Sequence, residues 1–132
     1  MKKKNIVKNK EDFTRIINKK NGYVNKYFII NEEVNNDLMP KFGITFIKNM
    51  CNAVNRNKLK RQIKSIIDNN KNIYENNKNY IIIIRKDALN KSYKELEDNL
   101  ISLFNKLKEK IDEKYEEDIY YNTYDIYVMW MY

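Results

Sequence analysis

The chain has 132 residues, which suffice for one domain with a single buried core but not for two. Its 26 Lys and Arg outnumber 18 Asp and Glu and give a net charge of +8, typical of proteins that bind nucleic acid or an anionic membrane surface. One cysteine and no histidine exclude an internal disulfide, a thiolate metal cluster and the usual general base. The apolar runs are too short to span a membrane and no secretory signal is visible, so we expect a cytoplasmic protein.

The first part of the chain predicts one helix and two strands. Apolar residues recur at helical spacing over residues 9–20, and Asn9 is a candidate N-cap. After a turn at Asn21 and Gly22, β-branched and aromatic residues predict a strand within residues 23–31. Residues 42–48 predict a second strand, which we expect to pair antiparallel with the first.

The remainder predicts a helix, a buried strand and a second long helix. Basic and apolar residues occupy separate arcs of a helix predicted over residues 52–70. The branched apolar run at residues 79–86 is typical of a strand buried on both faces. Ser92 and Glu95 form a capping box that starts the last helix. The apolar stripe of that helix consists of Leu96, Leu100, Leu103, Phe104, Leu107 and Ile111.

The order helix, strand, strand, helix, strand, helix predicts an α/β (α+β) sandwich with a small mixed sheet. We expect one domain over residues 1–111, followed by an acidic and then aromatic C-terminal extension over residues 112–132. The extension is open to three interpretations: an extra strand or helix that covers apolar surface, a contact with a partner, or an appendage without a role. Packing on the domain is favoured, because an exposed aromatic and β-prone stretch invites aggregation.

The helix predicted over residues 52–70 carries uncompensated positive charge. No Asp or Glu occurs between Asp37 and Asp68, although acids are frequent elsewhere. An ordinary solvated helix face mixes the two signs, so that Glu and Lys can pair one turn apart. Since Arg and Lys neutralise phosphates, the pattern favours contact with nucleic acid over an ordinary solvated face. One arc of the helix is apolar, with Leu59, Ile63, Ile66 and Ile67, and the neighbouring arc holds Arg56, Asn57, Lys60, Arg61 and Lys64.

The stretch "FGITFIKNMCNAVNRNKLKRQIK", followed by "YIIIIRKDAL", resembles the signature of the protein subunit of bacterial ribonuclease P. The resemblance covers about residues 4–108 and is specific, because the matching positions are in register. These positions are Gly43, Lys48, Asn52, Ala53, Val54, Arg56, Asn57, Lys60 and Arg61. The chain departs from the signature at Ile47, Asn49, Cys51, Lys58 and Lys64, and Cys51 stands where a glycine is usual before the helix.

The resemblance implies a ribonucleoprotein in which the RNA subunit holds Mg²⁺ and performs the cleavage. Such an enzyme removes the 5′ leader from precursor tRNA. Its protein subunit is not the catalyst but binds the RNA subunit and the leader and supports metal binding, so no residue of this chain is assigned as catalytic or as a metal ligand. The alternative is a general RNA-binding or ribosome-associated protein without an enzymatic role, and a purely structural basic protein is a third possibility. The RNA-contacting residues that the resemblance implies are Lys48, Asn52, Arg56, Asn57, Lys58, Lys60, Arg61 and Lys64.

The resemblance also implies a fold similar to the second domain of a small-subunit ribosomal protein. That fold contains a left-handed crossover between parallel strands, whereas the general rule for such crossovers predicts the right-handed form. The left-handed crossover expected here therefore rests on the resemblance alone, as does the description of residues 1–111 as a ribonuclease P protein domain.

Strand parity predicts a second surface on the sheet. One set of alternating residues in the two early strands is expected to face the last helix, and the other set would form a partly open floor beside Phe13. The resemblance implies that the single-stranded leader binds there, helped by aromatic stacking. The alternative is that Phe13 is an ordinary core residue. At the two other positions where the family usually has an aromatic residue, this chain has Ile17 and Asn31. The implied cleft residues are Phe13, Ile17, Tyr27, Ile29, Asn31 and Thr45.

Overall fold

The computed structural model describes residues 1–109 and 126–127. One mixed sheet runs through the molecule in the strand order β1-β2-β4-β3-β5. Its strands are β1 (Tyr23–Val24), β2 (Phe28–Val34), β3 (Lys41–Ile47), β4 (Lys78–Ile84) and β5 (Ile126–Tyr127). The helices are α1 (Lys10–Asn18), α2 (Ala53–Asn69) and α3 (Tyr93–Glu109), with the short 3-10 helices η1 (Lys3–Asn5) and η2 (Lys86–Ala88).

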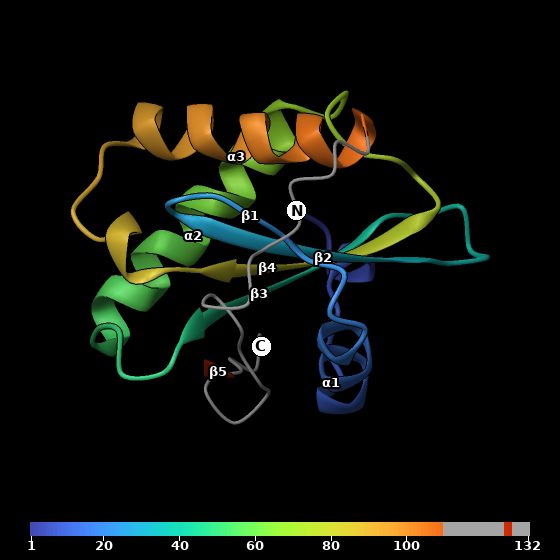
Figure 1. Ribbon diagram of the computed structural model, residues 1–132, viewed down its shortest axis with the longest axis horizontal. Coiled ribbons are helices and arrows are strands. Elements are labelled where there is room, and N and C mark those ends of the chain that lie inside the picture. The colour runs from blue at the N-terminus through green and yellow to red at the C-terminus, as the bar shows by residue number, and fades with distance from the viewer. Residues whose placement is uncertain (110–125, 128–132) are drawn as a thin grey trace.

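The helices lie on both faces of the sheet: α2 and α3 cover one face, and α1 lies against the other (Figure 1). This arrangement confirms the predicted α/β sandwich with a mixed sheet. The order of α1, β2, β3, α2, β4 and α3 along the chain also matches the prediction. The domain boundary at residue 111 stays a prediction, since residues 110–125 and 128–132 lie outside the described part of the chain.

The predicted antiparallel pairing between the strands at residues 23–31 and 42–48 is wrong. β2 pairs antiparallel with β4, and β3 pairs parallel with β4, so that β4 lies between them. Ile82 has Ile30 as its partner on one side and Ile44 on the other. β4 takes the central position because most of its residues are apolar and buried on both faces, as its continuous apolar run predicts.

Residues 23–31 form a hairpin instead of one strand. The Asn25 side chain accepts hydrogen bonds from the backbone N–H groups of Tyr27 and Phe28, at 3.0 and 2.9 Å. Short amide side chains stabilise turns in this way by bonding to nearby backbone groups. The turn ends β1 and lays it antiparallel on β2.

β3, α2 and β4 form a crossover between parallel strands. Its left-handed sense stays a prediction. The turn from β3 to α2 places Asn49 at a φ of 61°, a left-handed conformation that asparagine tolerates better than most residues. Cys51 does not have a positive φ, so replacing the usual glycine there imposes no backbone strain on the turn.

Two apolar clusters hold the layers together. The larger lies between the sheet and the pair α2 and α3, and the smaller lies between the sheet and α1. Alternate residues of the strands divide between the two clusters, as strand parity predicts. Phe28, Ile30, Ile44 and Phe46 belong to the larger cluster, and Ile29, Ile81 and Ile83 to the smaller.

α3 begins and packs as the sequence predicts. Ser92 Oγ accepts a hydrogen bond from the backbone N–H of Glu95 at 3.1 Å, so the predicted N-terminal cap is present. The predicted stripe is buried at Leu96, Leu100, Leu103, Phe104 and Leu107, while Ile111 lies outside the described residues.

Part of the C-terminal extension pairs with the sheet. Ile126 pairs with Ile47 and Tyr127 with Phe46, both antiparallel, so β5 covers part of the edge of β3. At β5 the extension therefore packs on the domain, which is the interpretation that the sequence favours.

Candidate nucleic-acid interface

α2 is fixed on the sheet by its apolar side. All residues of its predicted apolar arc are at most 5% exposed and belong to the larger cluster. Asn52 Oδ1 accepts a hydrogen bond from the backbone N–H of Asn55 at 2.9 Å and so caps the start of the helix. The neighbouring arc, which carries the positive charge, is therefore held at the surface in a defined orientation.

The charged arc combines half-buried and exposed side chains. Arg56 Nη1 donates a hydrogen bond to the carbonyl of Cys51 at 2.7 Å, which fixes the guanidinium beside the start of α2. Burial lowers the pKa of the ammonium groups of Lys60 and Lys64. The charge of Lys64 lowers the pKa of Lys60 further, whereas Asp68 raises that of Lys64. Asn57 and Arg61 are the exposed members of the arc, and Lys58, which lies outside the arc, is also exposed.

Among the described residues, the cations in the middle of α2 have no carboxylate close enough to form an ion pair. Within the described residues, Lys60, Arg61 and Lys64 form no ion pair with a carboxylate. Ion pairs with carboxylates do form at five basic side chains outside α2, and these are Arg15, Lys19, Lys41, Lys78 and Lys94. The excess of positive over negative charge in the sequence of α2 is therefore also present in the three-dimensional surroundings of these side chains.

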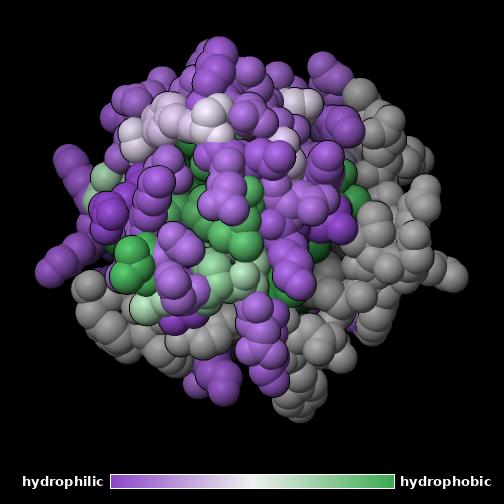
Figure 2. Space-filling model, turned by 90° about the vertical axis from the view of Figure 1, so that its left-hand side faces the viewer, coloured by the Kyte–Doolittle hydropathy of each residue, from purple (hydrophilic) through white to green (hydrophobic). Residues whose placement is uncertain are grey.

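A second basic region lies where β3 and β4 end. These strands are parallel, with Phe46 opposite Ile84, so the residues that follow them emerge at the same end of the sheet. Lys48 follows β3 and Lys86 follows β4, and both are exposed. Figure 2 looks onto this end, where hydrophilic side chains surround a smaller group of hydrophobic ones. Lys86 was not among the residues selected from the sequence. The available signal was the basic pair Arg85 and Lys86, which directly follows the apolar strand.

The predicted open floor on the other face of the sheet is wrong. α1 covers this face, and the side chains assigned to the floor on it are buried. They are Phe13, Ile17 and Ile29, each 2% exposed, and Asn31 and Thr45, each 0% exposed. The ring of Phe13 packs directly against the backbone of Gly43. Phe13 is therefore a core residue, which is the alternative that the sequence left open.

Tyr27 lies on the opposite face from the one predicted. Its ring meets that of Phe28 edge to face, with 6.3 Å between the centroids, and it belongs to the larger cluster. Strand parity fails here because Tyr27 lies in the turn made by Asn25, before β2 begins. Lys91 Nζ lies 5.9 Å from the centroid of the Tyr27 ring, within the range of a cation–π contact.

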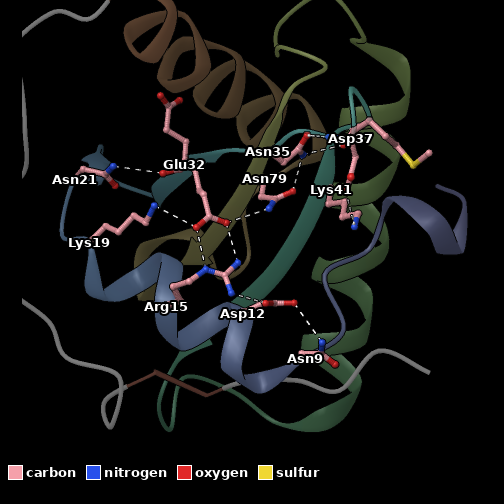
Figure 3. A network of polar contacts seen from close by, with 12 residues as sticks. Asn9, Asp12, Arg15, Lys19, Asn21, Glu32, Asn35, Asp37, Lys41 and Asn79 are labelled. Atoms are coloured by element: carbon pink, nitrogen blue, oxygen red, sulfur yellow. Dashed lines mark hydrogen bonds and ion pairs between the residues drawn. The ribbon is translucent and has the colours of Figure 1, made fainter.

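A polar network fixes α1 against β2 (Figure 3). Arg15 donates from Nε and Nη2 to the two carboxylate oxygens of Glu33, at 2.9 and 2.8 Å, and from Nη1 to Asp12 at 2.6 Å. Lys19 Nζ lies 3.1 Å from Glu33, and Asn79 Nδ2 donates to the same carboxylate at 3.1 Å. These bonds, that of Arg15 above all, lower the pKa of Glu33 to about 2. The network holds α1 over the face that was predicted to be open.

Basic residues near the start of the chain also lie beside α2. A groove of about 600 Å³ lies between this N-terminal segment and the helix. Its polar lining consists of Lys3, Lys8, Asn57, Lys60, Arg61 and Lys64. Sequence reasoning selected the residues of α2 but not Lys3 and Lys8, although the basic run "MKKKNIVKNK" was an available signal.

The described residues contain no group of His, Cys, Asp and Glu that could hold a metal ion. In the same part of the chain, no helix is both long enough and apolar enough to cross a bilayer. A small basic α/β fold with a strongly basic helix held at its surface is typical of the class of proteins that bind nucleic acid.

Comparison with known proteins identifies the family. The family model described as Ribonuclease P matches residues 1–108. The chain is 40% identical over 109 residues to the ribonuclease P protein component of Mycoplasma mycoides, covering 82% of this chain and 100% of that one. It is 33% identical over 106 residues to that of Bacillus mycoides, covering 79% and 91%.

A solved structure of similar fold is a Staphylococcus aureus RNase P protein mutant with defective mRNA degradation activity. It aligns with a TM-score of 0.72 and 29% identity, covering 80% of this chain and 90% of that one. The chain belongs to the ribonuclease P protein family. It is thus a protein component of a tRNA-processing ribonucleoprotein enzyme.

Proposed function

We propose that this protein binds the RNA subunit of ribonuclease P through α2 and supports removal of the 5′ leader from precursor tRNA in the cytoplasm. The observation that carries the proposal is that Lys60, Arg61 and Lys64 are held at the surface of α2 and form no ion pair with any carboxylate in the described part of the chain. Each cation that neutralises a phosphate releases a bound counterion, which favours association. The residues proposed to contact RNA are Lys48, Asn52, Arg56, Asn57, Lys58, Lys60, Arg61 and Lys64.

In this proposal the cleavage is assigned to the RNA subunit, which would hold the Mg²⁺ ions. The protein contributes positive charge beside the phosphates of the RNA subunit and of the substrate, where it offsets their mutual repulsion. The net charge of +8 supports this role. The protein should therefore matter most at low Mg²⁺, when fewer metal ions screen the phosphates.

The 5′ leader is proposed to contact the margin of the α1 face instead of its buried floor. Val24 and Ile47 are partly exposed and pack against the smaller cluster. They lie on β1 and β3, with β2 and β4 between them, and offer apolar surface to unpaired bases on either side of that face. Because Ile17 and Asn31 are buried and lack aromatic rings, we expect leader binding to rely less on stacking than three exposed aromatics would allow.

Cleavage of a precursor tRNA at low Mg²⁺ by the cognate RNA subunit, with and without the protein, tests the proposal. We expect wild-type protein to raise the rate, and the variant Arg56→Ala/Lys60→Ala/Lys64→Ala to bind the RNA subunit more weakly and stimulate less. The control removes the same charge from exposed lysines outside the interface, Lys10, Lys20 and Lys94.

Two outcomes would contradict the proposal. Wild-type protein that gives no stimulation at any concentration would exclude a role in leader removal. Equally tight binding of unrelated RNAs without stimulation would instead favour a general RNA-binding protein.

A further inference from the structure

The N-terminal segment, residues 1–9, is fixed on the edge of β3. Ile6 forms a parallel bridge with Phe42, and the backbone N–H of Val7 donates to the carbonyl of Phe42 at 2.9 Å. Val7 is 4% exposed and belongs to the smaller cluster, and the Asn5 amide donates to the carbonyl of Pro40 at 2.8 Å. These contacts set the positions of the lysines on either side of them.

The segment and α2 form the two walls of the groove described above. Lys3 and Lys8 line it from the segment, and α2 contributes Asn57, Lys60, Arg61 and Lys64. Half-buried Ile6 also lines the groove and offers apolar surface between the charged side chains. None of the lining residues within 1–109 and 126–127 has a carboxylate side chain.

This concentration of like charge is unfavourable for the protein alone. Cations that line the same groove repel one another, and they do so most strongly where water is partly excluded. Burial lowers the pKa of Lys60 and Lys64, in agreement with cations that are poorly solvated. Asp68, the acid nearest along α2, does not line the groove and instead pairs with the α-amino group of Met1 at 2.5 Å. A polyanion in the groove would relieve the repulsion.

We infer that the groove binds the sugar–phosphate backbone of the RNA subunit from two sides, with Lys3 and Lys8 as the second wall. The inference rests on the proposed function and extends it from the surface of α2 to the N-terminal segment. A groove with cations on both sides can enclose a single nucleic-acid strand, whereas a planar membrane surface would contact only the rims of the groove. Ile6 suits contact with the less polar faces of the sugars between successive phosphates.

Binding of the isolated RNA subunit over a range of salt concentrations tests the inference. The double variant Lys3→Ala/Lys8→Ala removes the two lysine charges that the segment contributes to the groove, and Lys60→Ala/Lys64→Ala removes two of the three positive charges that α2 contributes. Lys20→Ala/Lys94→Ala loses the same charge elsewhere. We expect each of the first two to bind roughly tenfold more weakly and to make the slope of log K against log salt shallower by about one to two. The control should keep the wild-type slope.

The possible results separate the inference from the function on which it rests. If Lys3→Ala/Lys8→Ala behaves as the control while Lys60→Ala/Lys64→Ala loses affinity, the inference is overturned and the proposed function stands. If both behave as the control, the proposed function itself fails. If Lys3→Ala/Lys8→Ala weakens binding of precursor tRNA to the holoenzyme but not binding of the RNA subunit, the groove serves the substrate and the inference is again wrong.

A measurement on the unaltered protein guards against effects on folding. Amine acetylation followed by mass spectrometry should show Lys3 and Lys8 protected by the RNA subunit, and Lys94, on the outer side of α3, not protected. Equal reactivity of Lys3 and Lys8 with and without the RNA subunit would contradict the inference, whatever the variants show.

Discussion

Phe13 packs so closely on Gly43 that β3 has no space for a side chain at this position. A Cβ atom on Gly43 would lie 2.5 Å from Phe13 Cζ and 2.7 Å from Ile81 Cδ1, well inside van der Waals contact. Gly43 does not have a positive φ, so its missing side chain provides space and not backbone freedom. The glycine in β3 makes room for the ring that α1 lays on the sheet.

Gly43→Ala should therefore lower the free energy of unfolding by about 1 to 3 kcal/mol, because the added methyl group overpacks a rigid ring. Urea denaturation measures this change. Gly43→Ala should cost less stability when it is added to Phe13→Leu than when it is added to wild type, since the smaller leucine side chain leaves space for the methyl group. A single variant as stable as wild type would show that the ring moves aside freely.

Phe13→Ala should cost about 3 to 5 kcal/mol of folding free energy, as expected for a buried phenylalanine. Where the variant is still folded, the holoenzyme should lose affinity equally for precursor tRNA with a leader and for mature tRNA without one. Binding of both ligands beside a denaturation curve checks this. A loss confined to the leader-bearing ligand, with stability unchanged, would mean that Phe13 contacts the leader directly.

Ionisation of the Glu33 carboxyl group makes the free energy of unfolding depend on pH in the acid range. Its pKa falls from the usual 4.5 to about 2, chiefly through the hydrogen bonds from Arg15, although burial opposes the shift. Since the folded-state pKa is the lower one, the network stabilises the protein fully above about pH 4.5, and this contribution is lost as the pH falls toward 2. Glu33→Gln should cost about 1 kcal/mol at neutral pH, a discounted value because Arg15 is half-exposed.

Melting temperatures of wild type and Glu33→Gln between pH 7 and pH 2 test this linkage. The two curves should converge in acid, because protonation removes from wild type what the substitution has already removed. Arg15→Lys is the matched variant, which keeps the charge but loses the two-pronged geometry. Parallel curves over the whole range would show that Glu33 contributes nothing through its charge.

Truncation after Glu117 should leave stimulation of the RNA subunit largely intact, because the family match ends at residue 108. It removes β5 and leaves the edge of β3 at Phe46 and Ile47 without its partner strand. An unpaired edge promotes association between molecules. We expect more aggregation or a lower melting temperature, measured by light scattering and thermal unfolding. A well-folded truncated protein that no longer stimulates cleavage would show that the extension has a role in function.

The sequence predicts elements better than it predicts their partners. α2 and α3 follow from apolar spacing and caps that lie within each helix, so local patterns suffice. Strand partners depend on segments far apart in the chain: β2 and β3 are successive strands, yet β4 separates them. The hairpin at Asn25 depends on one side chain bonding to backbone two and three residues on, which interrupts strand parity before Tyr27.

The candidate interface also has parts that local sequence predicts and parts that depend on tertiary packing. The basic arc of α2 is visible in the sequence because a lack of acids is a local property. The burial of Phe13 depends on where α1 packs, which the contact between Arg15 and Glu33 helps to fix across two elements. Lys3 and Lys8 reach α2 only because the N-terminal segment is bound to β3, and a single bridge leaves no periodic signal in the sequence.

Until the chain has been synthesised as far as Ile84, β2 and β3 have no common partner, because both pair with β4. The sheet therefore cannot close while only the first half of the chain has left the ribosome, and pairings between distant segments make folding slow relative to a helical bundle of this length. α2 lies inside the loop that must close. The proposed RNA-binding surface of α2 is thus assembled in the same step as the sheet. If the proposal holds, an unfinished chain has the lysines but not the ordered arrangement that would let them compete for the RNA subunit.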